Sequence, residues 1–280
     1  MLQSLRQFFT RTAEPGPPRS VPEGQRVYAV GDVHGRLDLF DALLSAIAAD
    51  DGASPPAQTT LVLLGDLVDR GEESAGVIAR ARQLQARCDT RILAGNHEEM
   101  FLRSFEELEM FRHFIRHGGR ETVLSYGVDR DAFNEATLEE AQELMRAAVP
   151  QEDIAFLESL EDMVTIGDYL FVHAGIDPRV PLAEQRQQDL RWIREPFLSH
   201  ADPHELLVVH GHTITDEPED RGNRIGIDTG AFASGRLTAL RLEGQSRTFI
   251  AVVEGEDGAI RTEYSPPDRA PAVAAVQANG

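Results

Sequence analysis

The chain has no lysine, and all 27 of its basic residues are arginine. Against them stand 47 acidic residues, which give a formal charge of −20. A field of this sign repels nucleic acid and anionic membranes, so we expect neither as a partner. A local phosphate site remains compatible with it, because a guanidinium group can donate two parallel hydrogen bonds to a phosphate. A compositional bias toward arginine would also explain the missing lysine.

Cysteine and aromatic residues are scarce as well. The single cysteine, Cys88, excludes an internal disulfide framework. Aromatic residues make up 6% of the chain, too few for a stacking track along single-stranded nucleic acid. No run approaches 18 consecutive apolar residues, and the first residues lack the apolar centre of a signal peptide. We therefore expect no membrane span and a cytoplasmic protein.

The remaining composition, 41% apolar and 26% charged, suits one globular domain of this length, 280 residues. Proline and glycine gather toward both ends of the chain. We expect a flexible tail over residues 1–25, a folded domain over 26–264 and a second flexible tail over 265–280.

In the first part of the domain, short apolar runs alternate with amphipathic segments. Strands are expected at Arg26–Val30, Thr60–Leu64 and Arg91–Ala94, with helices at Leu37–Asp50 and Ser74–Arg87 between them. This β-α-β-α-β order is typical of α/β layering around a largely parallel sheet.

Residues 98–160 carry almost only helical periodicity, and we expect a helical insert there. Thr137 and Glu140 have the spacing of a capping box, and Pro150 can open the next helix. Acidic residues crowd the start of this segment, as on an ordinary solvated helix face. They are Glu98, Glu99, Glu106 and Glu107.

After the insert the pattern returns to short strands. They are expected at Met163–Ile166, Tyr169–Val172, Leu206–Val209, Arg224–Ile227, Leu237–Leu242 and Thr248–Val253. Short turns between some of them favour antiparallel pairing. The most economical fold is α/β, with two packed mixed β-sheets flanked by helices.

Five short polar motifs follow apolar runs at predicted strand ends. They read GDVHG from Gly31, GDLVDRG from Gly65, GNHE from Gly95, VHAG from Val172 and GHT from Gly211. The carboxyl ends of strands in an α/β sheet face a common crevice, so residues far apart in the chain can meet there.

These motifs offer oxygen and imidazole nitrogen donors and no thiolate, a set that suits Mn, Fe or Zn. One aspartate can bridge two ions, and two ions about 3.5–4 Å apart can clamp a phosphate and ionise a water molecule. Six donors exceed the four that a single tetrahedral zinc needs. The sequence therefore predicts two divalent ions. The candidate ligands are Asp32, His34, Asp66, Asn96, His173 and His212.

In this order the five motifs resemble the calcineurin-like metallophosphoesterase superfamily. The complete GDLVDRG and the later IDTGA from Ile227 resemble, more narrowly, the phosphoprotein phosphatase family in its short bacterial and phage-type serine/threonine phosphatase branch. The resemblance covers residues 26–245 or so. It implies the calcineurin-like sandwich fold and a dinuclear centre, with manganese expected ahead of iron or zinc.

The resemblance also implies a role for each ligand. Asp32 and His34 would hold the first ion, and Asp66 would bridge both ions. The second ion would be completed by Asn96, His173 and His212. Hydrolysis would proceed by direct attack of the bridging hydroxide on phosphorus, without a phosphoenzyme.

Four further residues are implied to act on the substrate. His97 would protonate the leaving oxygen, and Asp69 would orient its ring. Arg70 would bind the phosphate oxygens, and Arg194 is the best match for a second arginine. Arg191 is the competing choice for that second position.

Other polar residues near the motifs can have a purely structural role as well as a functional one. His210 supports the ligands or is structural, Asp228 lies near the site or caps a turn, and Trp192 is expected to be a core anchor. Surface or packing roles are expected for His113, His117, His200 and His204.

The motifs specify the family more closely than the substrate. A serine/threonine protein phosphatase is expected, acting on a phosphorylated protein or a small phosphoester. A diadenosine-tetraphosphate hydrolase shares the same front motifs and is the alternative. A non-catalytic metal-binding scaffold is disfavoured, because every expected metal, acid and anchor position is filled. The oligomeric state is not indicated.

Overall fold

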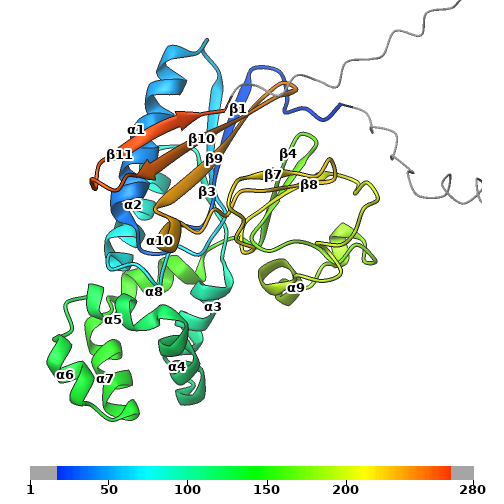
Figure 1. Ribbon diagram of the computed structural model, residues 1–280. Coiled ribbons are helices and arrows are strands. Elements are labelled where there is room, and N and C mark those ends of the chain that lie inside the picture. The colour runs from blue at the N-terminus through cyan, green and yellow to red at the C-terminus, as the bar shows by residue number, and fades with distance from the viewer. Residues whose placement is uncertain (1–17, 266–280) are drawn as a thin grey trace, which may run out of the picture.

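Two β-sheets and the helices around them make up the part of the chain that the computed structural model describes, residues 18–265. The outer parts of both predicted tails, residues 1–17 and 266–280, lie outside the described residues. Figure 1 shows the larger sheet beside the smaller one, with helices on the outer sides. The predicted fold class, two mixed sheets flanked by helices, is confirmed.

The larger sheet has the strand order β11-β10-β9-β1-β2-β3. The strands β1, β2 and β3 are parallel, and β9, β10 and β11 continue the sheet in antiparallel pairs. In chain order these strands are β1 (Gln25–Val30), β2 (Gln58–Leu63), β3 (Thr90–Ile92), β9 (Arg236–Glu243), β10 (Ser246–Glu254) and β11 (Ile260–Tyr264).

The smaller sheet has the order β4-β5-β6-β8-β7. Its centre, β5, β6 and β8, is parallel, and β4 and β7 add antiparallel edges. The strands are β4 (Met163–Ile166), β5 (Tyr169–Val172), β6 (Leu207–His210), β7 (Glu219–Asp220) and β8 (Arg224–Gly226).

Strand β1 explains why the two sheets pack face to face. Its side chains alternate, so that Val27 and Ala29 join the apolar cluster between the sheets while Tyr28 and Val30 join the cluster under the helices. Phe171 of β5 faces the first pair across the sheet interface. A strand covered on both faces is expected to read as a continuous apolar run, as β1 does.

Helices cover the outer faces of both sheets. Helices α1 (Leu37–Ala53) and α2 (Ser74–Arg87) pack their apolar sides onto the larger sheet. The smaller sheet is covered by α9 (Gln187–Trp192) and the loops around it, including the short 3-10 helix η2 (Leu182–Glu184). Helix α10 (Ala231–Ser234) precedes β9.

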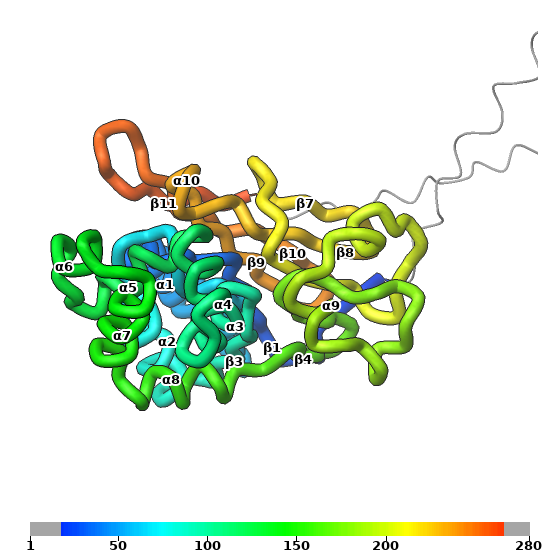
Figure 2. The backbone as a smooth tube through the Cα atoms, turned by 90° about the horizontal axis from the view of Figure 1, so that it is seen from below, coloured from blue at the N-terminus to red at the C-terminus, as the bar shows by residue number. Residues whose placement is uncertain are grey.

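Between β3 and β4 the chain is helical, and Figure 2 shows these helices gathered on the side away from α9. The expected capping box forms: the Glu140 amide donates to Thr137 Oγ1 and the Thr137 amide to Glu140 Oε2. That this segment is an insert in the domain stays a prediction. The elements are α3 (Asn96–Arg103), α4 (Leu108–Phe114), the π-helical turn η1 (Ile115–Gly119), α5 (Arg120–Ser125), α6 (Arg130–Glu135), α7 (Leu138–Ala148) and α8 (Gln151–Glu158).

Two features of the sheet edges differ from the sequence prediction. Strand β11 was not expected, because it lies at an edge with most of its side chains exposed and so carries no apolar run. The described end of the predicted N-terminal tail is packed: Val21 is buried, and its amide donates to the Gly244 carbonyl. The packed chain therefore begins before residue 26.

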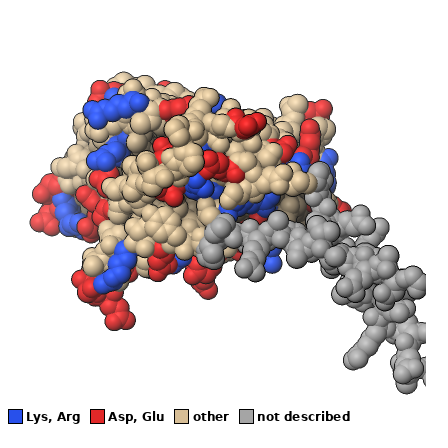
Figure 3. Space-filling view, turned by 90° about the horizontal axis from the view of Figure 1, so that it is seen from above, with Lys and Arg blue, Asp and Glu red and all other residues tan. Residues whose placement is uncertain are grey.

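Charged side chains of both signs are interspersed on the face shown in Figure 3. Many of the arginines are paired with carboxylates, as Arg247 is with Asp220 at 2.6 Å. No helix of the described residues has the length and apolar character needed to cross a membrane.

Candidate metal centre and active site

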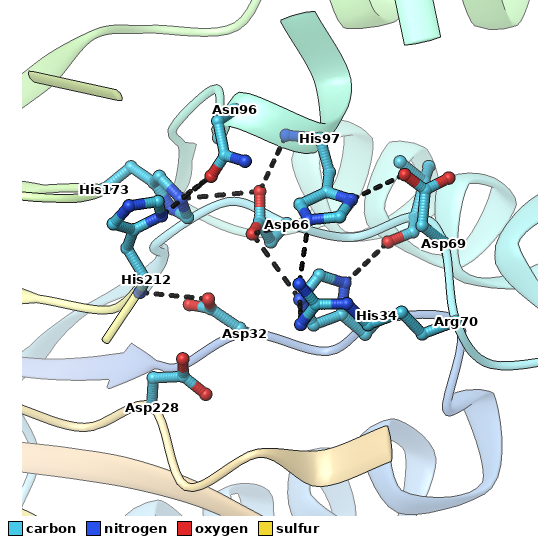
Figure 4. Close-up of polar contacts among 12 residues, drawn as sticks. Asp32, His34, Asp66, Asp69, Arg70, Asn96, His97, His173, His212 and Asp228 are labelled. Carbon is cyan, nitrogen blue, oxygen red and sulfur yellow. Dashed lines mark hydrogen bonds and ion pairs between the residues drawn. The ribbon is translucent and has the colours of Figure 1, made fainter. Parts of the chain in front are cut away.

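The predicted ligands lie in loops that follow five strands. Asp32 and His34 follow β1 and Asp66 follows β2, while Asn96 opens α3 just after β3. His173 comes directly after β5, and His212 comes two residues after β6. Figure 4 shows that all six side chains converge on one place, as the strand-end argument predicts.

The backbone at this place is strained. Among the described residues other than glycine, the positive φ angles belong to His34, Asp66, Asp69, Arg70 and His212. All five are residues that the motifs single out. Left-handed backbone is costly for residues with a side chain, and such strain gathers where the surrounding structure fixes a functional group.

Asp66 lies at the centre of the cluster. Its Oδ2 is 3.5 Å from His34 Nε2, and its Oδ1 is 3.4 Å from His173 Nε2. Two groups of donor atoms, each within 4.8 Å of one another, share this carboxylate: His34, Asp66 and His97 form one, and Asp66, His173 and His212 form the other. A shared carboxylate between two groups is the geometry that a bridging ligand requires.

Asn96 and Asp32 complete the surroundings. Asn96 Oδ1 lies 3.0 Å from His173 Nε2 and 2.8 Å from His212 Nδ1. Asp32 Oδ2 accepts a hydrogen bond from the His212 amide, and its Oδ1 is buried with no partner among the described residues. A buried carboxylate oxygen left without a partner is costly, and a cation would satisfy it.

The histidine tautomers point to the same conclusion. His34 Nδ1 and His173 Nδ1 each lie 2.8 Å from a backbone carbonyl, of Val68 and Leu64 respectively. Each ring therefore donates through Nδ1 and turns the lone pair of Nε2 toward Asp66. Lone pairs facing carboxylate oxygens repel unless a cation lies between them. The donor set thus fits divalent ions.

The pKa shifts of the buried ligands have burial as their main cause. Burial raises the pKa of Asp32 well above its usual value, and the charges of Asp228 and Asp66 raise it further. Burial likewise lowers the pKa of His173 to about 3 and that of His212 to about 2. Neutral imidazoles beside carboxylates are the protonation states that metal binding requires.

Two glycines leave the space that the ligands occupy. A Cβ on Gly95 would lie 2.1 Å from Asp66 Oδ1, and a Cβ on Gly211 would lie 2.0 Å from Asp32 Oδ1. Both glycines belong to the motifs. Any other residue at either position would displace a carboxylate oxygen of the cluster.

His97 is held by a buried chain of hydrogen bonds. Its Nδ1 lies 2.6 Å from Asp69 Oδ2, and Thr122 Oγ1 donates to Asp69 Oδ1 at 2.6 Å. Ser74 Oγ accepts from the Asp69 amide. The ring is thereby fixed with Nε2 toward the cluster, the orientation a proton donor needs. Sequence reasoning identified Asp69 but missed Thr122, which lies 53 positions away and in no motif.

The arginines separate into free and paired ones. Arg70 lies near His34 and His97 and stacks over the Phe232 ring, with its Cζ 4.4 Å from the ring centroid. Exposed Arg194 contacts the His212 carbonyl at 3.2 Å. Arg191 is paired with Asp162 at 2.7 Å and Glu99 at 3.6 Å. Neither Arg70 nor Arg194 has a carboxylate partner within residues 18–265, so this geometry favours Arg194 over Arg191.

Three other residues near the site make contacts that fit a structural role. His210 is buried, with Nδ1 3.0 Å from the Gly211 carbonyl, and is not part of either donor group. Asp228 accepts from the Gly230 amide and so caps a turn, while lying close enough to raise the pKa of Asp32. Trp192 packs against the main core and donates to Glu99.

Glu98 corrects the sequence interpretation of the acidic run, because it is fully buried rather than part of a solvated face. Its carboxylate accepts from the amides of Asp66, Leu67, Val68 and Gly95. The GNHE motif was the available signal, since its glutamate follows the ligand by two residues. Glu98 therefore holds the loop that carries Asp66.

Replacing Glu98 with alanine is expected to lower the free energy of unfolding by about 3–5 kcal/mol, because several buried amides lose their acceptor at about 1–3 kcal/mol each. Glu98→Gln keeps one oxygen and should cost less. Urea denaturation measures both, with exposed Glu106→Ala as the matched control. Stability within 0.5 kcal/mol of the parent protein would contradict a structural role for this carboxylate.

Comparison with known proteins agrees with this geometry. The family described as calcineurin-like phosphoesterase matches residues 25–233. An asymmetrical bis(5'-nucleosyl)-tetraphosphatase of Anoxybacillus flavithermus is 26% identical over 76% of this chain and 88% of its own. Serine/threonine-protein phosphatase 1 of Salmonella typhimurium is 28% identical over 78% of this chain and 93% of its own.

Solved structures share the fold. A crystal structure provisionally assigned as a diadenosine tetraphosphatase has a TM-score of 0.57 at 20% identity, over 89% of this chain and 99% of that one. A cold-active protein tyrosine phosphatase has a TM-score of 0.55 at 19% identity, over 89% of this chain and 81% of that one. The family match, the sandwich fold and the convergent donors agree: this chain belongs to the calcineurin-like phosphoesterase family.

Proposed function

We propose that this chain is a metal-dependent phosphatase that hydrolyses phosphomonoesters, with phosphorylated serine and threonine of proteins as its substrates. The observation that carries the proposal is the His97–Asp69 pair beside the shared Asp66 carboxylate. A serine or threonine alkoxide is a poor leaving group and needs a proton as the ester bond breaks. A fixed imidazole next to the phosphate site supplies that proton.

The proposed roles of the chain's own residues follow from their placement. Two divalent ions held by the six ligands would neutralise phosphoryl oxygens and lower the pKa of bound water to about 7, so that they would supply a hydroxide nucleophile at neutral pH. Arg70 and Arg194 bind and orient the phosphoryl oxygens, since neither is neutralised by a carboxylate among residues 18–265. His97 acts in its doubly protonated form: it gives its Nε2 proton to the leaving oxygen and becomes neutral, while Nδ1–H keeps donating to Asp69, whose negative charge stabilises the protonated ring.

A second candidate substrate is diadenosine tetraphosphate. The relative from Anoxybacillus flavithermus, named for that activity, covers this chain as fully as the Salmonella protein phosphatase does. The leaving group in that reaction is a nucleotide, whose phosphate oxygen departs without needing a strong proton donor. A fixed proton donor contributes most when the leaving group is an alkoxide, which is why we propose the phosphomonoester. The motifs that carry His97 and Asp69 are common to both candidates, so the choice of substrate is made by experiment.

A substrate panel tests the choice. The purified protein is assayed with manganese against a phosphoserine peptide, a phosphothreonine peptide and diadenosine tetraphosphate at equal concentration. We expect kcat/KM for the phosphopeptides to exceed that for the dinucleotide by at least tenfold. Turnover of the dinucleotide alone would replace the proposal with its alternative. Manganese as the metal and the cytoplasm as the compartment are further predictions.

A further inference from the structure

The last turn of α4 and the π-helical turn η1 that follows it carry a group of basic side chains in an otherwise acidic protein. Arg112, His113, Arg116 and His117 are all exposed, and no acidic residue lies between them in the chain. We call these four residues the basic face. Residues four apart are neighbours on a helix surface, which pairs Arg112 with Arg116 and His113 with His117. The rings of His113 and His117 have centroids 4.0 Å apart, although the backbone leaves helical geometry at His117.

The basic face adjoins the phosphate-binding arginine. The carbonyl of Gly118, the next residue, accepts a hydrogen bond from the Arg70 amide at 3.0 Å. A Cβ on Gly118 would lie 2.7 Å from Arg70 Cγ, so the two backbones are in direct contact.

The arginines of this face are available to a ligand. Within residues 18–265, Arg116 makes no ion pair or side-chain hydrogen bond, whereas Arg103, Arg120 and Arg146 of the same helical segment are all paired. Arg112 has one ion pair, with Glu109 at 3.5 Å, and both side chains are exposed. An exposed pair of that kind is weak and readily exchanged.

Stabilisation of helix α4 would explain part of this clustering of basic residues. Cations near the C-terminus of α4 complement the helix dipole, and each contributes about 0.3–1 kcal/mol at most exposed positions. A dipole role requires no contact with the active site, however, and it does not explain why the face abuts Arg70. Thermal stability and substrate preference separate the two roles.

Resting on the proposed function, we propose that the basic face binds acidic residues that flank the phosphorylated serine or threonine, so that the enzyme selects acidic phosphosites. The distance fits such a flank. The four helical steps from Arg116 back to Arg112 rise about 6 Å. About two residues of an extended peptide span the same length. The acidic positions that matter should thus lie within a few residues of the phosphate.

Two matched pairs of phosphoserine peptides test this inference. The flank precedes the phosphoserine in one pair and follows it in the other, and within each pair one peptide carries three aspartates and the other three asparagines. We expect the parent protein to give a higher kcat/KM on the aspartate peptide, mainly through a lower KM. The preference should shrink when the salt concentration is raised, because exposed charges are screened.

Variants then locate the effect. Arg112→Gln combined with Arg116→Gln should reduce the aspartate-over-asparagine ratio of kcat/KM by about three- to tenfold, the range for two exposed charge contacts. Arg116→Lys should keep most of the ratio, since a lysine retains the charge. Arg130→Gln is the matched control, because Arg130 is exposed, lacks an ion pair within residues 18–265 and opens α6, on the far side of the helical segment from α4 (Figure 1). It should leave both the ratio and the activity unchanged.

Several outcomes would overturn the inference. Equal kcat/KM of the parent protein on both peptides would end it while leaving the proposed function intact. An unchanged ratio in the double variant with a lower melting temperature would assign the face to helix stability. If the double variant hydrolysed diadenosine tetraphosphate more slowly but both peptides as fast as the parent protein, the basic face would bind the polyphosphate chain of that substrate instead. No turnover of either peptide would instead remove the proposed function itself.

Discussion

Replacing Asp66 with asparagine is expected to lower kcat by at least about 10³-fold and to strip the protein of bound metal. The amide keeps the shape of the side chain but replaces one carboxylate oxygen with an NH₂ group, which cannot bind a cation. Because both donor groups share Asp66, one substitution weakens both sites. Removing a group on which the whole catalytic unit depends costs several orders of magnitude in rate.

Metal content per chain after gel filtration, together with kcat on a phosphoserine peptide, measures this effect. Asp131→Asn, the same change at an exposed position of α6, is the matched control and should alter neither. An Asp66→Asn protein that keeps its metal and more than a tenth of its activity would show that this carboxylate does not hold the centre together.

The second large effect is expected at His97. His97→Asn should lower kcat on phosphoserine by about 10²–10⁴-fold, the usual contribution of a positioned proton donor. The loss should be much smaller on p-nitrophenyl phosphate, because that phenolate departs without a proton. Asp69→Asn should give a partial loss with the same dependence on the leaving group, since an amide lacks the negative charge that stabilises the protonated ring and accepts the 2.6 Å hydrogen bond more weakly.

The His97 variant also separates two interpretations of the same geometry. His97 Nε2 lies within the donor group that contains His34 and Asp66, so position alone allows it to be a ligand. Its Nε2 is 3.9 Å from Asp66 Oδ2, farther than the corresponding distance for His34. As a proton donor it can be replaced with metal content unchanged. Loss of metal, or an equal loss of rate on both substrates, would contradict that role.

The strands that carry the site were predictable because each is a short apolar run ending in a polar motif. Strands β4 and β5 begin and end where the sequence indicates, and α2 does as well. Burial on two faces makes β1 continuously apolar, and this signal is strong in a single sequence. An edge strand such as β11 has no such signal, because it packs few side chains.

The convergence of Asp32, Asp66 and His212 was also predictable, since strand ends meet at one edge of a sheet. The residues that hold these ligands in place could not be predicted. Thr122 reaches Asp69 only because a helix from elsewhere in the chain packs there, and no local pattern records such a contact. Glu98 looked like one of several surface acids, and its burial depends on four amides brought to it by another loop.

The class of substrate could not be predicted from the sequence either. Relatives of equal identity to this chain, 26%, are named as a protein phosphatase and as a dinucleoside tetraphosphatase, so overall similarity does not choose between the two substrates. We expect surfaces around the site, such as the proposed basic face, to distinguish these substrates, and the residues of that face belong to no motif. Only the structure shows that the basic face lies close to Arg70.

Anomalous diffraction from crystals grown with manganese tests the central claim most directly. If the centre is dinuclear, we expect two peaks about 3.5–4 Å apart on either side of the Asp66 carboxylate, one toward His34 and the other toward His173. A single peak, or peaks that avoid Asp66, would contradict a dinuclear centre built from these scattered residues.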